Sequence, residues 1–152
     1  MGLNPTTRLF TVAVAWVAMT VGTQTATADD ALARPTHRVV ASYFHRTVRC
    51  PTCQKVGSSI EETIKAGFAA ELKDGRLEWR TMDFQDPRNA SFVAAFGITG
   101  PTFIIMDVRD NRVTAWKATP KTWSLLGDKA AFSSYIRAEV RSVLDAKPVV
   151  AK

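Results

Sequence analysis

Residues 44–53 read FHRTVRCPTC and contain the only two cysteines of the 152-residue chain, Cys50 and Cys53. A β-branched and aromatic run over residues 39–44 leads into them, which is typical of a buried strand. Pro51 suits the first turn of a helix, because the amide that proline lacks would have no partner there. This stretch therefore predicts a strand, a short loop and a helix that begins at or just after Cys50.

The cysteines stand at the head of an apolar stripe. Its spacing of four residues predicts one helix of about twenty residues that ends near Gly75. The stripe consists of Val56, Ile60, Ile64, Phe68 and Leu72.

Further elements follow with the same kind of signal. We expect a strand over residues 76–84, a short helix from Asp86 to Phe96, and a hairpin with strands over 102–106 and 113–117. Asp128 is a good cap for a last helix. The apolar face of that helix comprises Phe132, Tyr135, Ile136, Val140, Val143 and Leu144. The order of elements predicts an α/β protein of thioredoxin topology, with a central mixed sheet of about four strands flanked by helices.

The first 28 residues have the features of a signal peptide. Arg8 is followed by an apolar run over residues 9–21 and by the pattern Ala-x-Ala at residues 26–28. The run is too short to span a bilayer, which favours a cleaved leader over an uncleaved membrane anchor. We expect cleavage after Ala28, export to a bacterial periplasm or out of the cell, and no membrane span in the mature protein. The remaining chain divides into a flexible lead-in (29–37), one thioredoxin-like domain (38–146) and a disordered tail (147–152).

The chain is moderately basic, with a formal net charge of +6, of which the leader holds only Arg8. The basic residues are spread through the sequence, without the dense patch and interleaved aromatic residues of a nucleic-acid binder. We therefore expect no nucleic-acid partner, while an anionic protein partner is compatible with the charge.

Three interpretations of the cysteine pair compete. A structural disulfide would restrain the unfolded chain very little, because the loop that it closes is so short. A closed zinc site usually needs four ligands, and the domain offers only His37 and His45 beside the cysteines. A Cys-x-x-Cys at a helix N-terminus is the arrangement that lowers a thiol pKa, so the pattern favours thiol redox chemistry without a cofactor.

The position of each cysteine predicts its role. Cys50 is the expected nucleophile, since the partial positive charge of a helix start stabilises its thiolate, and Cys53 is the expected resolving thiol that forms a disulfide with it. His45, Arg46 and Arg49 lie on the approach to Cys50 and are candidates for lowering its pKa. The alternatives are an exposed loop histidine and solvated arginines.

Pro101 lies just before the predicted third strand, where thioredoxin folds place a cis-proline against the active-site disulfide. The segment from Gly97 to Pro101 is one residue shorter than the usual thioredoxin spacing. The expected fold favours a cis-proline that contacts the substrate, and the shorter spacing leaves an ordinary trans turn residue as the alternative.

Several stretches together resemble a known family. Residues 44–53, 67–68, 71–79 and 123–128 are similar to small thioredoxin-like proteins labelled nitrophenyl compound nitroreductase subunit, ArsF family, and the resemblance covers nearly all of residues 39–144. It implies a thioredoxin-like domain with a dithiol role. The chain shows no flavin-binding feature, so at most it would pass electrons to a separate reductase subunit.

The sequence also departs from ordinary thioredoxins. Their Trp-Cys-Gly-Pro-Cys motif is replaced, and the acidic residue usual on the preceding strand corresponds here to the region of Ser42 and Tyr43. Without that carboxylate a proposed proton acceptor for Cys53 is missing, which favours a dedicated partner over general reductase activity.

The leading prediction is an exported thiol-disulfide oxidoreductase or dithiol electron carrier, acting as a monomer on a protein thiol or disulfide of a membrane or periplasmic redox protein. One alternative is a module in which Cys50, Cys53 and His45 bind a soft ion such as Cu(I) or As(III). Another is an interaction domain with an inert disulfide.

Overall fold

A computed structural model describes residues 35–146 of the protein, so the predicted signal peptide and C-terminal tail lie outside the described residues. In chain order the elements are β1 (His37–His45), α2 (Pro51–Gly67), α3 (Ala69–Lys73), β2 (Leu77–Asp83), the 3₁₀ turn η1 (Pro87–Asn89), α4 (Ala90–Phe96), β3 (Thr102–Arg109), β4 (Arg112–Ala118), the 3₁₀ turn η2 (Pro120–Thr122) and α5 (Lys129–Leu144). None of the helices within residues 35–146 is long and apolar enough to cross a membrane.

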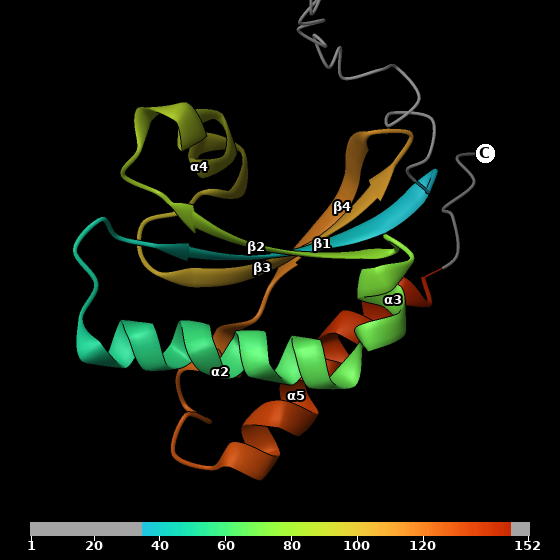
Figure 1. Ribbon diagram of the computed structural model, residues 1–152. Coiled ribbons are helices and arrows are strands. Elements are labelled where there is room, and N and C mark those ends of the chain that lie inside the picture. Colours follow the sequence, from blue (N-terminus) through green and yellow to red (C-terminus); the bar gives the residue numbers. More distant parts are fainter. Residues whose placement is uncertain (1–34, 147–152) are drawn as a thin grey trace, which may run out of the picture. The chain divides into compact units, whose positions relative to one another are not determined.

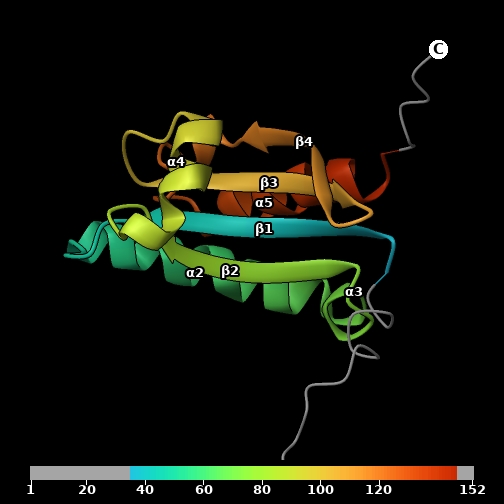
Figure 2. The same cartoon turned by 90° about the horizontal axis from the view of Figure 1, so that it is seen from above.

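The four strands form one mixed sheet in the order β2-β1-β3-β4. β1 pairs in parallel with β2 and antiparallel with β3, and β3 and β4 form the predicted hairpin. Helices α2 and α5 lie on one face of the sheet and α4 lies on the other (Figures 1 and 2). The order and direction of the strands give the chain the predicted thioredoxin-like α/β fold.

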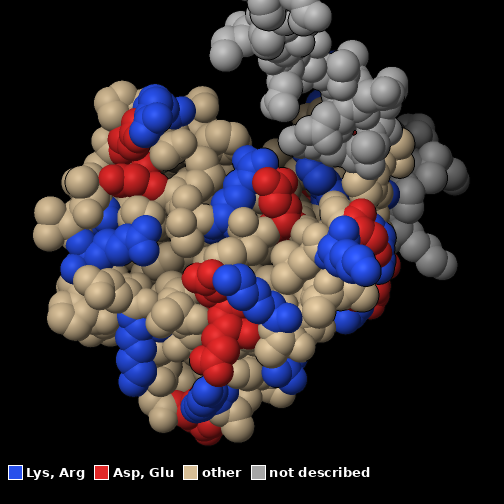
Figure 3. Space-filling view, viewed as in Figure 1, with Lys and Arg blue, Asp and Glu red and all other residues tan. Residues whose placement is uncertain are grey.

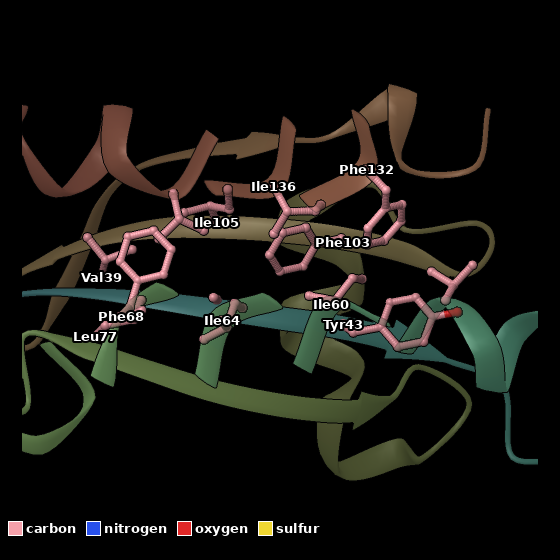
Figure 4. Packing of buried hydrophobic residues seen from close by; sticks show 13 residues of the cluster. Val39, Tyr43, Ile60, Ile64, Phe68, Leu77, Phe103, Ile105, Phe132 and Ile136 are labelled. Atoms are coloured by element: carbon pink, nitrogen blue, oxygen red, sulfur yellow. The ribbon is translucent and has the colours of Figure 1, made fainter. Parts of the chain in front are cut away.

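The main core lies between the sheet and the helices α2 and α5. β1 contributes every second residue to it, Val39, Ala41 and Tyr43, because side chains alternate across a strand. Figure 4 shows how the labelled side chains of β1, β3, α2 and α5 converge in this layer. The buried members from the helices are Val56, Ile60, Ile64, Phe132, Ile136 and Val140.

A second core covers the opposite face, where α4 packs. The other set of alternating β1 residues, including Val40 and Phe44, meets Phe96 and Ile98 from α4 and the turn after it. β1 is therefore buried on both faces as well as paired on both edges.

The predicted helix from Pro51 to Leu72 is not continuous, so that expectation was wrong. α2 ends at Gly67, and Phe68 leaves helical geometry with φ −139° and ψ 36° before α3 begins. On a straight helix, each step of four residues rotates the side-chain direction by about 40° around the axis. Over the four steps from Val56 to Leu72 the stripe would rotate by about 160°, so its last side chains would point away from the sheet. The break redirects the chain and keeps Phe68 in the core, 1% exposed.

Most of the predicted boundaries are confirmed. The side chain of Asp86 accepts a hydrogen bond from the Arg88 amide, and that of Asp128 accepts one from the Ala131 amide. η1 takes up the first turn of the predicted helix 86–96, η2 was not expected, and β1 begins at His37, one residue inside the predicted lead-in.

A partly buried ion pair joins α3 to α5 at the end of the sheet away from the cysteines. Glu71 Oε1 accepts a hydrogen bond from Arg141 Nη1 at 2.8 Å, and the Arg141 guanidinium lies 4.8 Å from the centroid of the Phe68 ring. Hydrogen bonds from its own backbone amide and from Arg141 hold the pKa of Glu71 below its ordinary value. This contact fixes α3 and the helix break against α5.

The Glu71 contact predicts a pH dependence of stability. Because its pKa is lower in the folded state, ionised Glu71 stabilises the fold above the pKa of the unfolded chain, and this contribution is lost as the pH falls through the folded value. Urea unfolding between about pH 6 and 3 should show a shallower decline for Glu71→Gln than for the wild type. Glu62→Gln, at an exposed ion pair on α2, is the control. Equal slopes for Glu71→Gln and the wild type would contradict the assignment.

Candidate active site

The two cysteines stand at the start of α2, as predicted, and form a disulfide. Cys50 is the N-cap residue in extended geometry, with φ −71° and ψ 158°, and its Sγ accepts a hydrogen bond from the Cys53 amide at 3.2 Å. The two Cα atoms are 5.1 Å apart. Cys50 is exposed and Cys53 is half-buried, so a partner can reach the first sulfur more easily than the second.

The helix start is electropositive and is not neutralised within the helix. Its first turn contains no acidic residue, and Pro51 occupies the first helical position. The Gln54 amide closes the first turn on the Cys50 carbonyl at 3.0 Å. Unpaired amides at a helix N-terminus favour an anion there, and a thiolate at Cys50 is such an anion.

The loop between β1 and Cys50 is tied to the end of β2. Thr47 Oγ1 donates to Asp83 Oδ2 at 2.6 Å, and the Thr47 amide donates to Gln85 Oε1 at 3.1 Å. The Thr47 hydroxyl and the Gln85 amide lower the pKa of Asp83. Thr47 and Asp83 were not recognised in the sequence, since the contact appears only when the parallel pairing of β1 and β2 sets Asp83 opposite His45, two residues before Thr47.

His45 is the last residue of β1 and is only 8% exposed, so its interpretation as an exposed loop residue was wrong. Its Nδ1 faces the Arg46 carbonyl at 2.9 Å, and its Nε2 contacts Nη2 of Arg49. A carbonyl can only accept and a guanidinium can only donate. The Nδ1 contact therefore places a ring proton on Nδ1, and Nε2 is the ring atom that faces Arg49.

The two arginines of the loop have different surroundings. The half-buried Arg49 reaches inward to His45, whereas the exposed Arg46 lies over the Phe84 ring, with Cζ 5.8 Å from the centroid. Arg49 is therefore the arginine with a fixed place beside the cysteines.

The described residues do not bring together a metal site. Within 35–146 no group of three His, Cys, Asp or Glu side chains could hold a metal ion. Both ring nitrogens of His45 are engaged, and His37 lies at the other end of β1, where its Nε2 is 3.1 Å from Asp107 Oδ1. The alternative ligand set of Cys50, Cys53 and His45 is thus not assembled.

Pro101 lies at the same end of the sheet as the cysteines. Thr102 is opposite Phe44 in the β1·β3 register, so Pro101 is next to the point where β1 ends. No peptide bond in the described part of the chain is cis, so the expected cis-proline was wrong and Pro101 is a trans residue ahead of β3.

Tyr43 is a residue of the site that the sequence did not indicate. Its side chain lies on the α2 face of β1, fully buried, and its hydroxyl donates to the Cys53 carbonyl at 3.1 Å. Burial raises the pKa of Tyr43, and the charge of Arg49 opposes that rise. Its neighbour Ser42 is buried as well, so no carboxylate stands at either position. Alternation of strand residues would have predicted the side on which Tyr43 lies, but not its contact with Cys53.

Charges of both signs are interspersed over the face of the molecule shown in Figure 3. Val48, two residues before Cys50 in the loop, is 85% exposed. This large apolar side chain is therefore open to a partner that approaches the loop.

Comparison with known proteins finds thioredoxins among the solved structures that match the chain. No protein-family model matches it, and no curated protein does. Thioredoxin from Fasciola hepatica is 17% identical with a TM-score of 0.38, covering 64% of this chain and 81% of that one. A mutant thioredoxin from Halobacterium salinarum is 21% identical with a TM-score of 0.41, covering 72% of this chain and 78% of that one. Likeness at this level carries no argument about activity, and the thioredoxin-like assignment follows from the strand order and directions.

The different surroundings of the two arginines predict different effects on thiol reactivity. Removal of the half-buried Arg49 charge should slow alkylation of Cys50 by iodoacetamide roughly two- to fivefold at a pH near 6, because less thiolate is present. Arg46→Ala is the matched control and should leave the rate unchanged. Equal alkylation rates for Arg49→Ala and the wild type would show that Arg49 does not lower the pKa of Cys50.

Proposed function

We propose that the protein is an exported thiol-disulfide oxidoreductase or dithiol electron carrier that acts through Cys50 and Cys53. The observation that carries this proposal is the placement of an exposed Cys50 at the N-cap of α2, bonded to a half-buried Cys53 one turn into the helix. The same placement disfavours an inert structural disulfide, since an exposed sulfur is open to attack by a partner thiolate.

The reaction consists of two exchanges. In the reduced protein the Cys50 thiolate attacks one sulfur of a partner disulfide, which forms a mixed disulfide and releases the other partner sulfur as a thiolate. Cys53 then loses its proton to solvent and attacks Cys50 Sγ. This step forms the Cys50–Cys53 disulfide and releases the second partner thiolate, so the partner gains two electrons. The reverse sequence oxidises a partner dithiol.

The proposed partner is a protein thiol or disulfide of a membrane or periplasmic redox protein, met after removal of residues 1–28. The signal-peptide features of the sequence support export. The exposed Val48 and the absence of the thioredoxin motif support a dedicated partner. The protein is proposed to act as a monomer.

The reduction potential of the cysteine pair tests the proposal. Protein without residues 1–28, equilibrated in glutathione or dithiothreitol buffers, should give a value between about −120 and −270 mV, the range of catalytic dithiols. The value also indicates the direction of electron flow. A potential below about −300 mV would identify a structural disulfide and overturn the proposal.

Single cysteine variants test the two roles. In Cys53→Ser the first exchange remains and the second is lost, so a mixed disulfide with a model protein disulfide should accumulate on non-reducing gels. Cys50→Ser should accumulate much less of it, because Cys53 is half-buried. The opposite pattern would reverse the assignment of nucleophile and resolving thiol.

A further inference from the structure

We propose that Tyr43 is a positioning residue for the resolving cysteine, holding the Cys53 peptide from the sheet side so that Cys53 Sγ stays within reach of Cys50. The proposal rests on the function proposed above and adds a residue from β1 to the second exchange step.

The contact links two elements that meet only in the folded protein. Tyr43 comes from the middle of the sheet and Cys53 from the first turn of α2, and the hydroxyl of Tyr43 lies 3.1 Å from the Cys53 carbonyl oxygen. A carbonyl oxygen only accepts, so the phenol must be the donor. Burial raises the pKa of Tyr43, which keeps the phenol protonated and available as a donor at neutral pH.

The ring that carries this hydroxyl has little freedom to move. A Cβ atom added at Gly57 would lie 3.1 Å from both Cδ1 and Cε1 of Tyr43, so the ring packs directly on the backbone of α2. Gly57 follows Cys53 by four residues, about one helical turn. Gly57 permits the ring of Tyr43 to approach α2 closely. In this position the Tyr43 hydroxyl reaches the carbonyl of Cys53, one turn before Gly57.

The hydrogen bond from Tyr43 restrains the position of Cys53 more than that of Cys50. Cys50 precedes the helix, and its carbonyl is held by the Gln54 amide instead. When the disulfide is reduced, its covalent restraint on the first turn is lost, and helix ends fray readily. The Tyr43 hydrogen bond then remains as a restraint on Cys53 from outside the helix. It thereby limits the conformational freedom that Cys53 must lose before it attacks.

Reaction of the reduced protein with the aromatic disulfide 5,5′-dithiobis(2-nitrobenzoate) separates the two exchanges. Attack by Cys50 releases one thionitrobenzoate at a rate that depends on reagent concentration and leaves the other bonded to Cys50. Attack by Cys53 on Cys50 Sγ then releases the second thionitrobenzoate at a rate independent of reagent concentration. The dithiol loses two electrons and the reagent is reduced to two thiolates.

Tyr43→Phe removes the hydroxyl and keeps the ring. We expect the second release to slow about three- to tenfold, as for the loss of one hydrogen bond, while the first keeps the wild-type rate. The matched control is Tyr135→Phe, the other tyrosine of the chain, whose hydroxyl contacts the Lys121 backbone instead. A merely structural role of Tyr43 would change both releases alike or neither.

The outcomes separate the two proposals. A wild-type protein that reaches only the mixed disulfide would contradict the proposed function. A biphasic wild type with an unchanged second release in Tyr43→Phe would overturn the role of Tyr43 alone.

Gly57→Ala provides a second variant that reaches the same contact from α2. Its added methyl group would lie 3.1 Å from Cδ1 and Cε1 of Tyr43, so the ring must shift by a few tenths of an ångström, and we expect the second release to slow by less than in Tyr43→Phe. Ser58→Ala, at an exposed neighbouring position, should leave both releases unchanged. A wild-type second release in a folded Gly57→Ala protein would count against the proposal.

Discussion

Burial of β1 on every side is the constraint on which the rest of the structure depends. The strand pairs with β2 on one edge and β3 on the other, and its alternate residues fill both cores. A strand so enclosed has one register and one direction, because a slip of one residue would exchange its two faces. The end of β1, and the loop that leaves it for Cys50, are therefore fixed in place before any contact of the loop itself is considered.

The chemistry at the site follows from that placement. The parallel pairing of β1 and β2 brings Asp83 beside Thr47, and the enclosed end of the strand holds His45 in contact with Arg49. The exposed sulfur stands at a helix start that lacks acidic residues in its first turn. Fixed backbone dipoles at this helix start would favour a thiolate at Cys50, whereas the half-buried Arg49 guanidinium contacts His45.

Local signals in the sequence were sufficient for the order of the elements and for the cysteine pair at the start of α2. Caps such as Asp86 and Asp128 act within a few residues, so their effect can be read from neighbouring positions. The break at Phe68 was missed because apolar residues spaced by four occur both in one continuous helix and in two consecutive helices separated by a break. The contacts of Tyr43 and Thr47 depend on residues ten and 36 positions away, which no local pattern contains.

The close packing of the Tyr43 ring on Gly57 also restricts how this site can change in evolution. A Cβ atom at position 57 would lie 3.1 Å from the Tyr43 ring, so a larger side chain there requires the ring to shift by a few tenths of an ångström or to become smaller, which couples substitutions at the two positions. A smaller side chain at position 43 would remove this constraint on position 57. Position 43 can therefore change while glycine is kept at position 57, whereas a larger residue at position 57 is accommodated more easily after the ring at position 43 has become smaller.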